Sequence, residues 1–398
     1  MLQQKPLLPV MLLMSAGIFG VMTLFVPPYG TKSVIVVLCL LLALTVLLRR
    51  YPSLSSLCIL SASFVFGMFL ATESIERGFA PLFSLPFGDR VEEVMSLQRD
   101  RMLQKYSEAG LSDDVLSVVS AMTLGERHGI SPSLRQAYNI AGAAHVFALS
   151  GLHISIIFMF ISMLLPTRLF PFASAVVQLL LLWTFVFLVG MHPSILRAAV
   201  MFTCYCLCRM LSRTTKSIDI LILTATLLLV YSPQWLFDVG FQMSFMAMVG
   251  ILLLQPHLQS LLPYRFLRYP WGIVTVTLSA TLGTAPLIAH YFGRLSCYGL
   301  LANIVVSPCA LAILFLSFLL LLFVFLQPHF AILSPITHLI ATILNAVVGF
   351  MNTSILWLSN LPGASIEGIS ITFAQVVLIY IFIACSLLIL YHLWHGMK

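Results

Sequence analysis

Apolar runs of membrane-spanning length recur along nearly the whole chain. A helix needs about 20 apolar residues to cross the roughly 30 Å hydrocarbon core of a bilayer. No stretch alternates strictly between apolar and polar residues, so the pattern favours helices over a transmembrane barrel. The candidate helices lie near residues 7–26, 31–48, 53–72, 144–165, 171–190, 194–212, 218–231, 240–255, 270–291, 299–326, 330–350 and 369–391. The pattern predicts an all-α, polytopic membrane protein with about twelve transmembrane helices.

One polar segment interrupts this pattern between the third and fourth windows. Residues 73–135 hold ten of the thirteen acidic residues and seven of the twenty basic ones, a net charge of −3 with histidine counted as neutral. Helical periodicity runs to Gly110, and helix-start signals at Ser112 and at Ser131-Pro132 predict two further short helices. We expect these amphipathic helices to lie on a membrane face, as a collar around an entrance or as a connector that covers the bundle.

The composition agrees with a membrane protein. Of the 398 residues, 60% are hydrophobic and 8% are charged, and the mean hydropathy is +1.06. Cytoplasmic loops of membrane proteins retain Lys and Arg. With the N-terminus inside, ten basic residues fall on the cytoplasmic side and only Lys32 and Arg294 fall in short outer loops. We therefore expect both termini in the cytoplasm and the polar segment outside it.

These patterns divide the chain into four parts. They are an N-terminal three-helix membrane region (1–72), an extracytoplasmic amphipathic helical collar (73–140), a membrane core (141–326) and C-terminal membrane helices (327–398).

Polar residues inside the apolar windows are the candidates for function, because such residues are costly in a membrane and usually face a partner, a cavity or a pathway. They are His145, Ser150, His153, His192, Arg197, Asp238, Gln242, Ser244, His290, Arg294 and Asn303. In the predicted topology most of them lie near the outer ends of their spans, with His153 about 12 Å deeper on a continuous helix. Helix-breaking or close-approach residues accompany them, namely Gly142, Gly151, Pro193, Gly240, Pro286 and Pro308. Because broken helices are tolerated where they line a cavity, these segments predict the wall of one passage.

Each of these residues also has a structural interpretation. A single intramembrane histidine is more often a packing residue bonded to a backbone carbonyl. Arg197 could pair with Asp238, which would make both residues structural. Ser150 is expected to bond the turn that precedes it, as serine in membrane helices often does. The convergence of several segments on one level favours the passage.

Catalytic templates fit the sequence poorly. Ser150-Gly151 with a histidine elsewhere is the pattern of a serine intramembrane protease, but Ala148 and Leu149 replace the Gly of G-x-S-G, and G-x-S-x-G is absent. H-E-x-x-H, H-x-H-x-D and G-x-x-x-x-G-K-[ST] are absent as well. We expect no metal, no cofactor and no enzyme activity, with an intramembrane serine hydrolase kept as an alternative.

The stretch TLGERHGISPSLRQAYNIAGAAHVFALSGLHISII resembles the signature of the ComEC-type competence proteins, an LGxR-like segment followed by GxxHxxAxSGxH. The residues that fill this pattern are Gly125, Arg127, Gly142, His145, Ala148, Ser150, Gly151 and His153. PSILRAAVM, DVGFQMSFMAMVGI and PLIAHYFGRLSCYGLLANIVVSP look like later blocks of the same family, so the likeness covers roughly residues 90–325.

The resemblance implies a channel of the bacterial inner membrane that passes one strand of DNA into the cytoplasm during natural transformation. Residues 141–326 would form its core. Arg197 and Arg294 would meet phosphates, together with Arg127 and Arg135 of the collar. The remaining roles fall to Asp238, which would hold a neighbouring Arg or His, and to Gln242, Asn303, Ser150 and His153, which would line or shape the passage.

Two soluble domains that family members often carry are not expected here. Residues 73–88 are too few for a five-stranded OB-like barrel, and no H-x-H-x-D motif of a metallo-β-lactamase-like domain occurs. The expected partners are therefore single-stranded DNA, membrane lipid, and separate DNA-binding, nuclease or cytoplasmic motor proteins. The acidity of the collar argues against its gripping a polyanion by itself. A transporter of a small solute or lipid-linked polymer is a further alternative.

Overall fold

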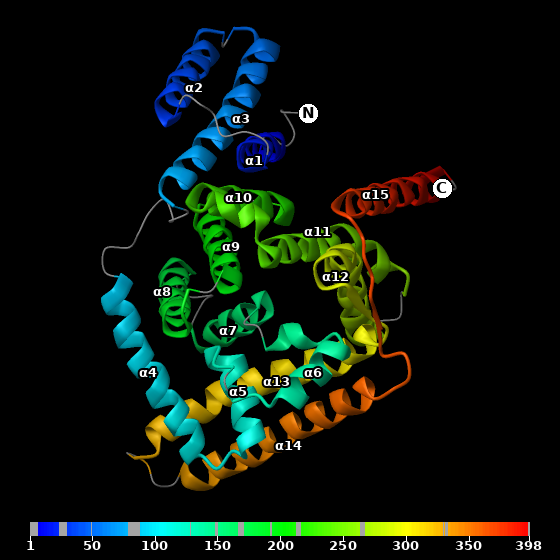
Figure 1. The fold of residues 1–398 in the computed structure, drawn as a ribbon. Helices are drawn as coiled ribbons and strands as arrows, with labels where there is room; N and C mark the ends of the chain where they lie inside the picture. The colour runs from blue at the N-terminus through cyan, green and yellow to red at the C-terminus, as the bar shows by residue number, and fades with distance from the viewer. Residues whose placement is uncertain are drawn as a thin grey trace. The chain divides into compact units, whose positions relative to one another are not determined.

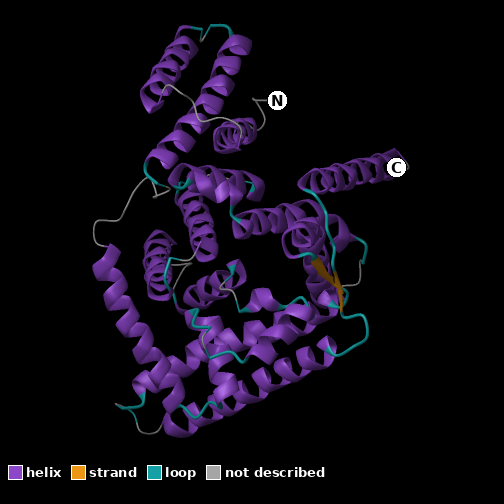
Figure 2. Ribbon diagram, viewed as in Figure 1, coloured by secondary structure: helices purple, strands orange, loops and turns teal. Residues whose placement is uncertain are grey.

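Helices form nearly all of the computed structural model (Figures 1 and 2). The structure describes residues 7–23, 30–48, 50–78, 88–127, 129–147, 150–165, 171–191, 193–211, 216–262, 267–328, 330 and 333–396.

Each of the twelve apolar windows contains a helix, which confirms the predicted helical fold. These helices are α1 (Leu7–Thr23), α2 (Gly30–Leu47), α3 (Pro52–Glu76), α7 (Gly151–Leu164), α8 (Pro171–Val189), α9 (Pro193–Met210), α10 (Ser217–Tyr231), α11 (Val239–Ser260), α12 (Arg268–Phe292), α13 (Gly299–Leu326), α14 (Ser334–Ser359) and α15 (Phe373–Gly396). The polar segment forms α4 (Gly88–Glu108), α5 (Asp113–Leu124) and α6 (Pro132–Ile140).

Many of these helices suit a membrane. Six of the described helices are long and apolar enough to cross one, namely α3, α8, α11, α12, α13 and α14. Shorter apolar helices occur in α1, α2, α7, α10 and α15. The protein is a helical membrane protein, and the number of twelve spans stays a prediction.

The fourth window begins later than predicted. A short 3₁₀ helix, η1 (Ala144–Val146), comes first, and α7 starts only at Gly151. The expected continuous helix from residue 144 was therefore wrong, and the depth estimated for His153 on such a helix does not apply. The cause is local, because Ser150 adopts an extended backbone conformation (φ −117°, ψ 172°) and caps the helix that follows.

The chain divides into two compact units, which we describe separately. Unit 1 comprises Met1–Glu93, Pro166–Trp183 and Met191–Phe245, and unit 2 comprises Val94–Leu165, Thr184–Gly190 and Met246–Lys398. The four-part division follows composition rather than packing, and it stays a prediction.

In unit 1, α1 and α3 approach each other closely. A Cβ atom on Gly17 would meet the backbone of Phe64, and one on Gly67 would meet the backbone of Met14. Glycines at these positions allow the two backbones into contact, as small residues do between membrane helices. Buried residues of α1, α3 and α10 form the core of this unit together with Phe241.

In unit 2, the short helix α5 lies in the core. Nine of its residues are buried, including Val118, Val119 and Met122. The apolar ones pack in one cluster with residues of α6, α13 and α14 (Figure 1). We expected an amphipathic helix on a membrane face, but most of α5 is buried, and only its first turn, with Asp113 and Asp114, is exposed. The Tyr106 hydroxyl of α4 donates to the carbonyl of Ser317 in α13 at 3.2 Å.

The described residues include one sheet, which the sequence did not predict. Strand β1 (Arg294–Ser296) pairs with β2 (Ser365–Glu367) in antiparallel register, with Arg294 opposite Glu367 (Figure 2). The amide of Cys297 donates to the Ala364 carbonyl at 3.0 Å. The pairing ties the α12–α13 connection to the α14–α15 connection, so these helix ends meet at one end of unit 2.

Candidate functional site

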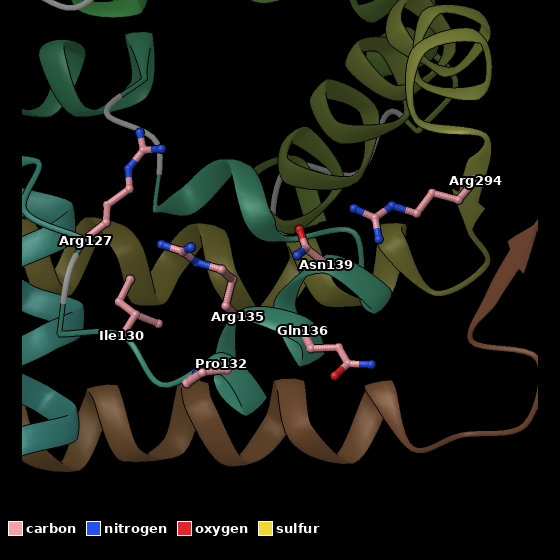
Figure 3. A pocket seen from close by; sticks show the side chains of 7 residues that line it. All are labelled: Arg127, Ile130, Pro132, Arg135, Gln136, Asn139 and Arg294. Carbon is pink, nitrogen blue, oxygen red and sulfur yellow. The ribbon is translucent and has the colours of Figure 1, made fainter.

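The polar segment of unit 2 contains a pocket of about 380 Å³ beside α6 (Figure 3). Its lining comprises Arg127, Ile130, Pro132, Arg135, Gln136, Asn139 and Arg294. Arg127 comes from the α5–α6 connection, and Arg294 comes from β1. Arg135 and Asn139 lie one helical turn apart on α6, so both face the same side of that helix. Segments more than 150 residues apart in the chain therefore contribute three guanidinium groups to one pocket.

Two local features hold the walls of this pocket. The Ser131 hydroxyl accepts a hydrogen bond from the Leu134 amide at 3.4 Å, so it caps α6 as the sequence predicted. At the other end of α6, Gly142 has φ +75°, and a Cβ atom there would lie 2.7 Å from the Ser296 Cβ. Gly142 thus permits the close contact between the end of α6 and β1.

The three arginines have no carboxylate partner among the described residues. Glu367, opposite Arg294 in the sheet, accepts a hydrogen bond from the Ser365 hydroxyl at 3.3 Å. Partial burial lowers the pKa of the Arg127 guanidinium, and the charge of Arg135 lowers it further. Because arginine stays protonated at neutral pH, the pocket is a cluster of mutually repelling positive charges.

The predicted residues Ser150 and His153 lie together at the start of α7. The Ser150 Oγ is 2.8 Å from Nδ1 of His153, and the Ser150 amide donates to the same nitrogen at 3.1 Å. An amide can only donate, so Nδ1 is the acceptor and the neutral ring carries its proton on Nε2. The arrangement is a capping box, in which side chain and backbone satisfy each other across the first turn. Ser150 bonds the turn after it, and the expectation that it bonds the preceding turn was wrong.

In unit 1, Arg197 of α9 is buried, with 4% of its side chain exposed, and its Nη1 lies 3.6 Å from Asp238 Oδ1. Nε and Nη1 of Arg197 have no hydrogen-bond partner in the described structure. The Asp238 carboxylate accepts from the Phe241 amide at 2.6 Å, and a Cβ atom on Gly240 would approach that carboxylate to 3.2 Å. The pairing of Arg197 with Asp238 considered from the sequence is present, and it leaves donors of the guanidinium unused.

The remaining predicted residues have varied surroundings. His290 meets the structural interpretation, because its Nδ1 lies 2.7 Å from the Ile371 carbonyl. Gln242 donates to the Leu236 carbonyl at 2.8 Å. Asn303 has a buried Oδ1 without a hydrogen-bond partner in the described part of the chain. His145 lies on η1 with an exposed side chain, and Ser244 is half-buried in α11.

The residues predicted to break helices fall both at helix starts and inside helices. Pro193 begins α9 and Gly151 begins α7, whereas Pro286 and Pro308 lie inside α12 and α13. His192 lies outside the described residues.

The structure brings some of these residues together and leaves others apart. Ser150 meets His153, and Arg197 meets Asp238, in different units. The single polar layer of the predicted passage stays a prediction. Sequence reasoning missed Gln136 and Asn139, although their spacing from Pro132 and Arg135 on a short helix offered a signal.

These features define a class: a helical membrane protein with buried polar residues in its apolar helices and a cationic pocket in its polar segment. The chain belongs to the Competence protein family, whose model matches residues 122–393, well over half of its length. The family resemblance predicted from the sequence is therefore confirmed.

Two curated relatives show the extent of the likeness. The chain is 29% identical over 221 residues to ComE operon protein 3 of Bacillus subtilis (strain 168), covering 54% of this chain and 27% of that protein. It is 30% identical over 247 residues to an uncharacterized protein of Aquifex aeolicus (strain VF5), covering 62% of this chain and 57% of that protein. The matched region thus spans about a quarter of the length of the Bacillus subtilis protein and somewhat over half of the length of the Aquifex aeolicus protein. No solved structure matches it.

Proposed function

We propose that this protein is a multi-pass channel of the bacterial inner membrane that passes single-stranded DNA to the cytoplasm, with both chain termini on the cytoplasmic side. The observation that carries the proposal is the family match over residues 122–393, which includes the arginine pocket and the buried Arg197. A polyanion needs positive groups along its path, and a buried arginine in an apolar helix is costly unless it serves a partner or a pathway.

Other proteins complete the process in this proposal. The chain has no nucleotide-binding loop of the G-x-x-x-x-G-K-[ST] type, so a cytoplasmic motor would supply the energy. Separate proteins would capture the DNA and degrade the strand that stays outside. The channel itself would have no enzyme activity.

Substitution of the predicted passage residues tests the site assignment. We expect cells with Arg197→Ala or His153→Ala to bring DNA to the outer face of the membrane and yet give few transformants, because the passage has lost a cation or its helix cap. Labelled DNA at the cell surface and transformant counts are the measurements. Normal transformation by both variants at wild-type protein levels would overturn the assignment.

A serine hydrolase is the second candidate, and the 2.8 Å contact between Ser150 Oγ and His153 Nδ1 favours it. A base within hydrogen-bond distance is what a serine nucleophile needs. The capping box accounts for the same contact without chemistry. A fluorophosphonate probe that labels the wild-type protein but not Ser150→Ala would support hydrolysis, and absence of labelling in intact protein would remove it.

A further inference from the structure

The arginine pocket has the donors of a phosphate-binding site and no internal partner for them. Its three guanidinium groups come from the α5–α6 connection, α6 and β1, and the Asn139 side chain adds an amide (Figure 3). None of the three arginines is ion-paired to a described carboxylate. Like charges held together are unfavourable alone, and a bound anion would relieve the repulsion.

Guanidinium groups match the oxygen geometry of phosphate and carboxylate. One carboxylate presents two oxygens, which is fewer than three arginines and an amide can serve. Successive phosphates of a nucleic-acid strand present oxygens along a line, which suits donors that come from three separate segments. The volume of about 380 Å³ is within the roughly 300–1,000 Å³ range of ligand pockets.

The lining residues also indicate whether binding of such a strand would depend on its base sequence. None of the described lining residues is aromatic, so they provide no platform of the kind on which bases stack in many single-strand-binding proteins. Contacts to phosphate position a strand but carry no sequence information. Binding at this pocket would therefore be independent of base sequence.

We infer that the pocket of Arg127, Arg135 and Arg294 binds the phosphodiester backbone of single-stranded nucleic acid. The inference rests on the proposed function, because DNA uptake is what brings such a strand to this protein. The pocket holds the strand on the polar segment, and Gly142 keeps α6 and β1 close enough for their arginines to share it.

The test measures binding of a fluorescent oligothymidylate to the purified full-length protein in nanodiscs, over a range of salt concentrations. Log affinity for single strands falls with log salt by about 0.7 per phosphate contact. Each of Arg127→Gln, Arg135→Gln and Arg294→Gln should weaken binding several-fold and reduce that slope by about 0.7. The triple variant should lose most of the affinity. Arg101→Gln, at an exposed position of α4 outside the pocket, is the matched control and should bind as the wild type does.

A gain-of-charge variant keeps the test valid where arginine variants fold poorly. Gln136 lines the pocket and is exposed, so Gln136→Lys should tighten binding several-fold and raise the slope. Unchanged binding by the triple variant, or by Gln136→Lys in folded protein, would overturn the inference.

Competitors separate the sources of phosphate. An oligothymidylate with a neutral methylphosphonate backbone should bind the wild type no better than the ordinary strand binds the triple variant. Binding of inorganic phosphate by wild-type protein that does not bind the strand would assign a free-anion site. Loss of strand binding in anionic but not zwitterionic nanodiscs would assign a lipid headgroup site. Both outcomes overturn the inference.

The two proposals fail in different ways. If the triple variant binds DNA normally while deletion of the gene stops DNA entry, the pocket assignment is wrong and the channel stands. If pocket variants lose strand binding while a deletion strain imports DNA normally, the pocket stands and the channel proposal fails.

Discussion

Ser150 and His153 form a hydrogen-bonded pair that either a helix cap or a catalytic base would explain. Nδ1 of His153 accepts from both the amide and the hydroxyl of Ser150. The amide contact distinguishes the two roles, because a capping box requires it and a nucleophile with its base does not. We interpret the pair as the device that starts α7 at Gly151.

Substitution of His153 separates the two roles. Glutamine is a normal partner in a capping box, so His153→Gln should keep the thermal stability and most of the transformation. His153→Leu loses the cap, which costs about 1 kcal/mol, and should lower both. Ser155→Ala, one turn along α7, is the control. Equal loss of transformation in the Gln and Leu variants, at equal stability, would point to chemistry at the histidine.

Gly142 has a left-handed backbone conformation, and a side chain at this position would collide with Ser296. Alanine there should cost about 1–3 kcal/mol for the backbone strain and more for the contact with Ser296. Gly110 has φ +82° and open space around it, so Gly110→Ala reports the strain alone. Thermal unfolding of the two purified variants should show a larger loss for Gly142→Ala. Equal losses would contradict the close packing of α6 on β1.

At the scale of elements, α5 shows how far local patterns predict packing. The start signals at Ser112 and Ser131 and the end at Gly110 predicted the short helices well, because caps and left-handed glycines act within one turn. The burial of α5 depends on α13 and α14, which begin 175 and 210 residues after its end (299 − 124 and 334 − 124). The β1–β2 pairing was missed for the same reason, since strands of three residues are too short to show alternation.

The burial of α5 predicts a stability effect that a surface helix would not have. Met122 is fully buried, so Met122→Ala should lower the free energy of unfolding by about 2–5 kcal/mol. Val94 of α4 is 53% exposed, and Val94→Ala should change it by less than about 0.5 kcal/mol. Denaturant unfolding of the purified protein measures both. A small loss of stability in Met122→Ala would contradict the burial of α5 and favour a position on the membrane face.

At the scale of the whole molecule, the helical membrane fold and the family followed from the sequence, because apolar length and motif spacing are properties of single segments. The pocket did not. The segment 73–135 is acidic on average, and this average argued against its holding a polyanion. The fold separates the charges, since Arg127 and Arg135 line one pocket with Arg294 of the distant β1, and none of the described acidic residues lines it.

The central claim is that this chain carries DNA across the cytoplasmic membrane. The most direct measurement follows labelled DNA in a strain that lacks the gene, scored separately at the outer face of the membrane and in the cytoplasm. We predict that the label reaches the outer face and that its cytoplasmic signal is lost, with recovery when the wild-type gene is restored. Cytoplasmic DNA at the wild-type level in the deletion strain would contradict the claim.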